Sequence, residues 1–150
     1  MRIGIAQLNT RAGDFAATAD RIEAFSHSAR EQGVELLLFS LAALTGPQPV
    51  DYASQEGNLL DLSDTLVGLS DRVACPCVVP VVTEMDGSPY AEAMLLRDGD
   101  VTPLRLMDYA AGMSAAQRGS GAERDGFPIA STFEFSGLRL GLGFTYDDLD

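Results

Sequence analysis

The sequence contains no lysine and no tryptophan, and it has only one histidine and two cysteines among its 150 residues. Without lysine, the chain has no side-chain amine that could act as a nucleophile or form a Schiff base. Two cysteines are too few for a disulfide scaffold, so we expect a cytoplasmic location. These absences exclude lysine chemistry and a small, disulfide-rich secreted protein.

Positive charge is scarce in this sequence as well. Ten arginines stand against 22 acidic residues, which gives a formal net charge of −12. Because so acidic a surface repels phosphate backbones, we expect no nucleic-acid partner. The apolar runs are far too short for a membrane span, the N-terminus has a strand pattern rather than that of a signal peptide, and no Gly-rich phosphate loop is present. We therefore predict no membrane partner and no cofactor.

The composition that is present, with 46% hydrophobic and 21% charged residues, is that of a folded chain, and 150 residues predict one domain spanning 1–150. The run from Arg2 to Leu8 is interpreted as a buried first strand. Asp14 is expected to cap the following helix, and Gly33 to end it. Strands are predicted near 2–8, 34–40, 77–82, 91–97, 101–107, 131–135 and 138–145, and helices near 15–32 and 54–74.

These elements predict an α/β fold in which helices cover one face of a sheet and the other, apolar face packs on a second sheet. The second helix carries a single apolar stripe of Leu59, Leu62, Leu66, Leu69 and Val73. This stripe could contact a partner helix or pack in the core. We expect core packing, because one apolar stripe per helix is the norm in layered α/β domains.

The pair Cys75 and Cys77 could indicate a metal or redox site. However, no second cysteine pair follows at zinc spacing, and the single histidine, His27, lies on the first helix beside its apolar face. We therefore interpret the cysteines as buried structural thiols and His27 as a surface or helix-end residue, with no metal site.

The run LLLFSLAALTG from Leu36 to Gly46 resembles a segment of the nitrilase superfamily (carbon–nitrogen hydrolases), and in particular the glutaminase domain of glutamine-dependent NAD synthetases. The family reads Phe-Pro-Glu-Leu-Ala-Leu-Thr-Gly here, and Phe39, Ala43, Leu44, Thr45 and Gly46 match. Further matching segments are Ile3–Asn9, Gly13–Phe15, Tyr90–Val101 and Gly137–Leu142. The resemblance implies a nitrilase-like α-β-β-α sandwich. Because the family's domain continues beyond the matched segments, we expect residues 1–150 to be its N-terminal portion, incomplete at the C-terminus.

The resemblance also implies where an amidase would carry its catalytic residues. The family uses a Glu as general base, a Lys for the developing oxyanion and a Cys nucleophile. In direct register those positions read Leu41, Pro103 and Thr145, and a slip of one residue places Tyr146 at the cysteine position. None of these side chains performs the family's chemistry, so no catalytic residue is predicted.

The sequence therefore favours a structural, regulatory or subunit-contact role without amidase activity, as a homodimer or with a synthetase partner domain or subunit. Two alternatives stay open at this point. One is a hydrolase with relocated chemistry in the acidic cluster of Asp147, Asp148 and Asp150, which could hold a divalent cation. The other is a fragment of a longer NAD synthetase whose activity needs the missing part.

Overall fold

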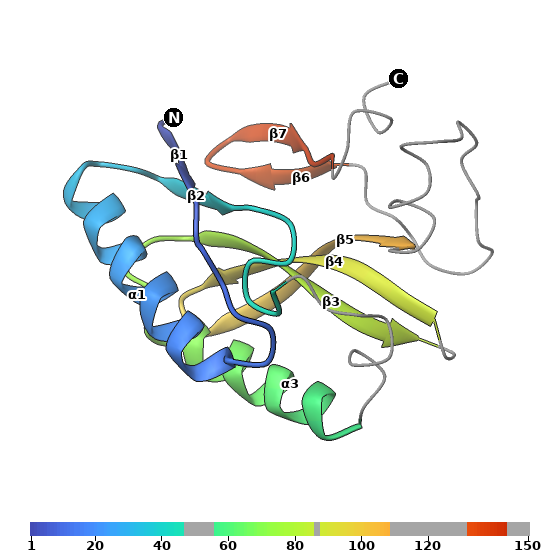
Figure 1. The fold of residues 1–150 in the computed structure, drawn as a ribbon. Coiled ribbons are helices and arrows are strands. Elements are labelled where there is room, and N and C mark those ends of the chain that lie inside the picture. Colours follow the sequence, from blue (N-terminus) through green and yellow to red (C-terminus); the bar gives the residue numbers. More distant parts are fainter. Residues whose placement is uncertain (47–55, 86–87, 109–131, 144–150) are drawn as a thin grey trace.

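The computed structural model describes residues 1–46, 56–85, 88–108 and 132–143 (Figure 1). In chain order, the elements are β1 (Ile3–Ala6), α1 (Phe15–Glu31), β2 (Leu36–Phe39), α3 (Glu56–Ser70), β3 (Cys77–Met85), β4 (Ser88–Arg97), β5 (Asp100–Asp108), β6 (Thr132–Phe135) and β7 (Leu138–Gly141). Each predicted strand and helix is found. Helix α3 ends at Ser70 rather than near residue 74, and no helix of the described residues is long and apolar enough to cross a membrane.

Strands β1 to β5 form one sheet in the order of the sequence. The pairs β1–β2 and β2–β3 are parallel, because α1 and α3 carry the chain back between them, whereas β3, β4 and β5 form an antiparallel meander. The turn between β4 and β5 has positive φ at Asp98 (53°) and Gly99 (85°). Two such residues in succession characterise the type I′ hairpin turn that the Asp-Gly pair predicts.

The sheet separates two layers, as Figure 1 shows. Helices α1 and α3 cover one face, where a core cluster includes Ile22, Leu44, Leu69 and Val79. The hairpin β6–β7 covers part of the other face, where Phe135 packs in a cluster with apolar residues of β2 to β5. The α/β arrangement predicted from the sequence, with helices on one face and a second sheet on the other, is therefore confirmed.

The helix-end signals give one confirmed and one partly wrong prediction. Helix α1 ends in a Schellman motif: Gly33 has φ 72° and donates to the Arg30 carbonyl at 2.9 Å, and Val34 donates to the Ala29 carbonyl at 3.0 Å. At the other end, Asp14 is the N-cap residue, but its side chain makes no capping hydrogen bond. The carboxylate and the first-turn amides of α1 are thus left for other contacts.

The prediction that the first strand is buried is wrong. In β1, the side chains of Ile3 and Ile5 are 44% and 79% exposed, whereas Ala6 is buried on the helix side. β1 is the edge strand of the sheet, and the buried cluster beneath the hairpin draws on β2 to β5 and not on β1. The alternation of residue types along the sequence cannot reveal this exposure. It identifies the apolar face of a strand, but not whether another element covers that face.

The apolar stripe of α3 and the cysteines have the structural roles expected for them. Leu62, Leu66 and Leu69 are buried in the core between α3 and the sheet. Cys75 and Cys77 are buried and unbridged, the Cys77 thiol donates to the Cys75 carbonyl at 3.2 Å, and burial raises the pKa of both thiols. His27 is exposed on α1.

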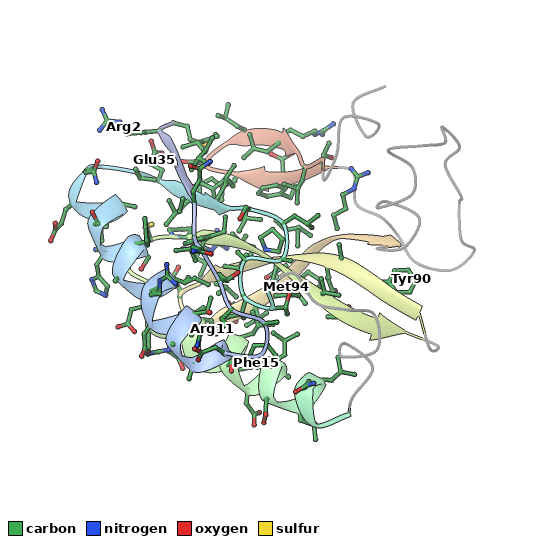
Figure 2. All side chains as sticks on the ribbon, viewed as in Figure 1. Arg2, Arg11, Phe15, Glu35, Tyr90 and Met94 are labelled. Atoms are coloured by element: carbon green, nitrogen blue, oxygen red, sulfur yellow. The ribbon has the colours of Figure 1, made fainter. Side chains whose placement is uncertain are left out.

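Glu35 connects the start of the chain to the β6–β7 hairpin (Figure 2). One carboxylate oxygen accepts from the backbone amide of Arg2 at 3.0 Å, and the other accepts from the Ser136 hydroxyl at 3.5 Å. On the helix side, the buried hydroxyl of Ser26 accepts from the Ala74 amide at 2.9 Å and so joins α1 to the segment before β3. All three hydrogen bonds join segments that are distant in sequence.

Candidate functional site

The segment after β2 forms a tight turn that carries Leu41. Ala43 donates its amide to the Ser40 carbonyl at 3.1 Å, and Gly46 donates to the Ala42 carbonyl at 2.7 Å. Ala42 has φ 57°, a left-handed conformation that costs a non-glycine residue about 1–2 kcal/mol. Ala43, Leu44 and Thr45 are buried below the turn, whereas Leu41 is 37% exposed above it. The packing of the turn therefore presents the side chain at position 41 to solvent.

Two contacts hold this turn against neighbouring segments. The Thr45 hydroxyl, in a residue that is 1% exposed, accepts from the Val82 amide of β3 at 3.2 Å. Gly46 lies so close to the loop after β1 that a Cβ atom on it would stand 2.9 Å from the Ala12 nitrogen. The segments after β1 and β2 thus meet at the carboxyl ends of parallel strands, which is where α/β folds usually bind ligands.

The position that the resemblance assigns to lysine lies on a different strand. Pro103 is exposed on β5 and pairs with Met94, next to a register irregularity. Strands β3 and β4 stand between it and β2, and three interstrand spacings amount to about 14 Å. The described residues therefore do not bring Leu41 and Pro103 into contact, and neither side chain carries a titratable group.

The remaining candidates, Thr145 and Tyr146 with the acidic residues Asp147, Asp148 and Asp150, lie outside the described residues. Within the described part of the chain, no group of three or more His, Cys, Asp or Glu side chains is placed to hold a metal ion. The structure consequently leaves both the nucleophile position and the proposed cation cluster as predictions.

Arg105 is a residue of this region that the sequence reasoning missed. Its guanidinium Nη1 donates to the carbonyl of Leu142 at 2.5 Å and so joins β5 to the segment that leads toward position 145. The signal for it was an arginine among the apolar residues of the predicted strand 101–107, and a solvent-facing position explains such an arginine equally well. A cation therefore lies beside Leu142, two residues along β5 from Pro103.

Glu92 on β4 is a second missed residue, because it is the one described carboxyl group with a resolved pKa shift. Burial raises the pKa of this carboxyl group, since a low-dielectric environment disfavours its charged form. Arg105 pairs with Ala93, the residue next to Glu92. Because successive side chains on a strand point to opposite faces, Glu92 and Arg105 lie on opposite faces of the sheet and cannot act together as base and cation.

Comparison with known proteins gives no matching family model and no matching curated protein. Solved structures do match. A variant of a nitrilase-superfamily amidase from Nesterenkonia sp. AN1 has a TM-score of 0.68 and 20% identity over 94% of this chain. Glutamine-dependent NAD synthetases from Acinetobacter baumannii and Cytophaga hutchinsonii have TM-scores of 0.67 and 0.65, with 19% and 16% identity over 93% of this chain. The fold is that of the nitrilase superfamily.

This nitrilase fold confirms the resemblance seen in the sequence at the level of architecture. The chain spans 54% of the matched amidase chain and 26% and 24% of the two synthetase chains, so it corresponds to a part of each. Another structure of the Nesterenkonia amidase records the Michael addition of acrylamide at its active-site cysteine. At identities below 25%, such a likeness establishes the fold and leaves the activity of this chain to be argued from its own residues.

Proposed function

We propose that this chain is a nitrilase-fold domain that does not hydrolyse amides and that acts as a structural or regulatory subunit. The observation that carries the proposal is Leu41. The turn after β2 presents this position to solvent at the carboxyl ends of the parallel strands, where the resemblance requires a general base. A leucine side chain there can neither accept a proton from a nucleophile nor return one to a leaving amine.

The expected loss of catalytic rate is large enough to support the absence of amidase activity. In another nucleophilic enzyme, removing one central catalytic residue lowers the rate by about 10⁶, or roughly 8 kcal/mol of transition-state stabilisation. Here Leu41 and Pro103 both lack the required groups, and the sequence has Thr145 or Tyr146 at the cysteine position. Among the described residues, Glu92 and Arg105 cannot replace the missing base and cation as a pair, because they lie on opposite faces of the sheet.

The experiment measures ammonia release from glutamine and from simple amides by the purified chain. We expect no more ammonia than from a heat-killed control, and a thiol-alkylating reagent should leave any trace release unchanged, because the only cysteines are the buried Cys75 and Cys77. Ammonia release well above the control that Thr145→Ala abolishes would show that the chain is an amidase after all.

The subunit-contact part of the proposal rests on the uncovered face of β1. Ile3 and Ile5 are exposed there, and Leu138 of β7 is 47% exposed on the same side of the sheet. An edge strand with exposed apolar residues favours association with another chain, and we propose a second copy of this one. The formal charge of −12 on each copy opposes this pairing.

Salt is therefore expected to strengthen the homodimer. The Debye length falls from about 30 Å at 0.01 M ionic strength to about 8 Å at 0.15 M, which screens the repulsion between two acidic copies. Sedimentation at both ionic strengths should show more dimer at the higher one. Ile5→Glu should abolish the dimer, whereas Leu60→Glu, which adds the same charge to an exposed position of α3, should only weaken it slightly. A monomer throughout, or a dimer that weakens with added salt, would refute the interface.

A further inference from the structure

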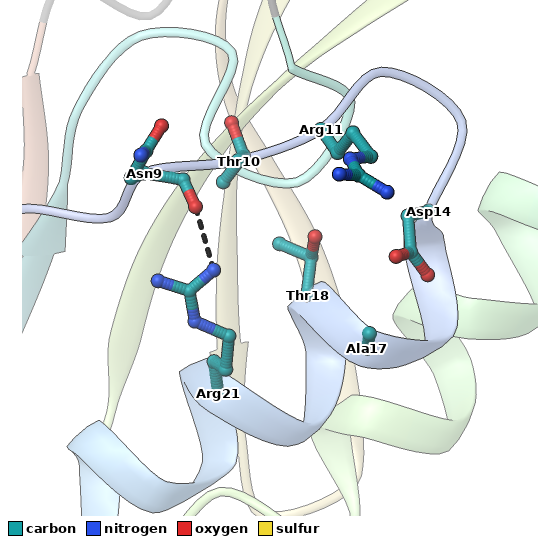
Figure 3. A pocket seen from close by; sticks show the side chains of 7 residues that line it. All are labelled: Asn9, Thr10, Arg11, Asp14, Ala17, Thr18 and Arg21. Carbon is teal, nitrogen blue, oxygen red and sulfur yellow. Dashed lines mark hydrogen bonds between the residues drawn. The ribbon is translucent and has the colours of Figure 1, made fainter.

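A cavity of about 230 Å³ lies between the loop that follows β1 and the first turns of α1 (Figure 3). Its lining is mostly polar and comes from one continuous stretch of the chain: Asn9, Thr10, Arg11, Asp14, Ala17, Thr18 and Arg21. Neither the amidase positions nor the β1 face discussed above contributes to it. The cavity is large enough for a small ion or the polar end of a metabolite and too small for a drug-sized ligand.

Thr18 is a buried polar residue that faces this cavity. The residue is 2% exposed and lines the cavity, and its side chain makes no hydrogen bond among the described residues. Figure 3 shows its side chain directed from α1 into the space below the loop. Since the hydroxyl oxygen itself is not fully enclosed by the described residues, it is accessible from the cavity. It can therefore donate to, or accept from, a polar group bound there.

Two arginines place positive charge at the same cavity. The guanidinium Nη1 of Arg21 donates to the Asn9 carbonyl at 2.6 Å, which fixes one edge of the group while leaving its other N–H donors available. The Arg11 side chain has no hydrogen-bond partner or ion pair among the described residues, although Asp14 lies nearby on the same lining. A planar guanidinium with free donors matches the oxygens of a phosphate or a carboxylate.

The N-terminal end of α1 adds to the positive electrostatic potential at the cavity. The first turn of the helix contains no acidic residue, and the Asp14 side chain makes no capping hydrogen bond. The backbone amides of the first turn therefore keep the partial positive charge of a helix N-terminus. With two arginines against one aspartate, the cavity has a formal charge of +1 in a chain whose formal net charge is −12. A locally positive, partly desolvated cavity in so acidic a chain selects anions.

We propose that this cavity binds a small oxyanion, the phosphate or carboxylate group of a metabolite, between Arg11, Arg21 and the Thr18 hydroxyl. Phosphate matches the donors best, because it offers more acceptor oxygens than a carboxylate to two guanidinium groups, a hydroxyl and the helix amides. The proposal is independent of the absence of amidase activity, and it would give a regulatory subunit a ligand to respond to.

The test is an NMR titration of the isotopically labelled chain with inorganic phosphate at constant ionic strength, with acetate as a parallel arm. We expect saturable shifts in the amides of residues 9–21, with a dissociation constant of about 1 mM or tighter. Arg11→Gln should weaken binding at least tenfold, and Thr18→Val should weaken it several-fold. Arg97→Gln, which makes the same charge change at an exposed site on β4, should leave binding unchanged.

The two arms distinguish the ligand class. Tighter binding of phosphate assigns the site to phosphorylated metabolites, and equal or tighter binding of acetate assigns it to carboxylates. The proposal is overturned if neither anion gives saturable shifts in residues 9–21, or if Arg11→Gln and Arg97→Gln weaken binding equally, since that would reduce the effect to general charge. Because the Arg11 side chain makes no hydrogen bond or ion pair among the described residues, we expect its substitution to change anion binding with little effect on folding.

Discussion

Replacing Gly46 by alanine is expected to lower the free energy of unfolding by about 2–5 kcal/mol, through two costs that add. The first is conformational: Gly46 has φ 73°, and a left-handed residue with a Cβ atom costs about 1–2 kcal/mol. The second is steric, because the new Cβ would lie 2.9 Å from the Ala12 nitrogen and 3.0 Å from its Cα. These are backbone atoms, so relief requires the two loops to separate, and overpacking of this kind costs about 1–3 kcal/mol.

Gly137 provides a matched control for this substitution. It has φ 77°, almost the same conformation, but a Cβ added there meets nothing within 4 Å. Gly137→Ala should therefore show the conformational cost alone, about 1–2 kcal/mol. Urea unfolding of both variants and of the parent chain measures the difference. Equal losses for the two variants would mean that the loops after β1 and β2 do not approach each other as closely as the structure has them.

The same contact bears on the anion cavity, because Ala12 belongs to the loop that contributes Asn9, Thr10 and Arg11 to it. The matching Thr45-Gly46 pair in the sequence thus has a physical reason that is separate from catalysis. Thr45 accepts a hydrogen bond from β3, and the missing Cβ of Gly46 allows the loop after β1 to lie close to the turn. A chain that keeps this framework can keep the fold while position 41 is a leucine.

Local signals in the sequence predicted the elements well. Gly33 indicated the end of α1 because a left-handed residue was needed there, and Asp98-Gly99 indicated a hairpin because both central residues of its turn need positive φ. The apolar stripe of α3 was correctly interpreted as core. Such features depend on the chain within a few residues, so they can be recognised without knowledge of the fold.

The features that sequence reasoning missed depend on contacts between distant segments. Ile5 was expected to be buried, but its exposure is decided by where the β6–β7 hairpin lies. The contact between Arg105 and Leu142 joins residues 37 positions apart. The proposed anion cavity is local in sequence, yet its signal was hidden, because Asp14 was interpreted as the cap of α1. An uncapped helix end and a hydroxyl that lines a cavity become visible only in three dimensions.

The second large effect is expected for Phe135, the residue that anchors the β6–β7 hairpin to the sheet. Phe135 is 7% exposed and packs in a cluster with Leu36, Val78 and Leu104. Phe135→Ala should lower the free energy of unfolding by about 3–5 kcal/mol, the usual cost of removing a buried aromatic ring. Leu138→Ala on the neighbouring strand should cost less than about 1 kcal/mol, because its side chain is 47% exposed and leaves no closed cavity.

Amide hydrogen exchange of Phe135→Ala measures whether the β6–β7 hairpin opens separately from the five-stranded sheet. Beyond the cluster around Phe135, the hydrogen bonds that join the hairpin segment to the sheet among the described residues include those of Leu142 with Arg105 and of Ser136 with Glu35. Two hydrogen bonds contribute less than the apolar cluster, so the hairpin of Phe135→Ala should open as a unit while β1 to β5 stay folded. Amides of β6 and β7 should then exchange much faster than those of β3 and β4. If all strands accelerate together, the hairpin belongs to the same cooperative unit as the sheet, and Arg105 and Leu142 stay joined until the whole domain unfolds.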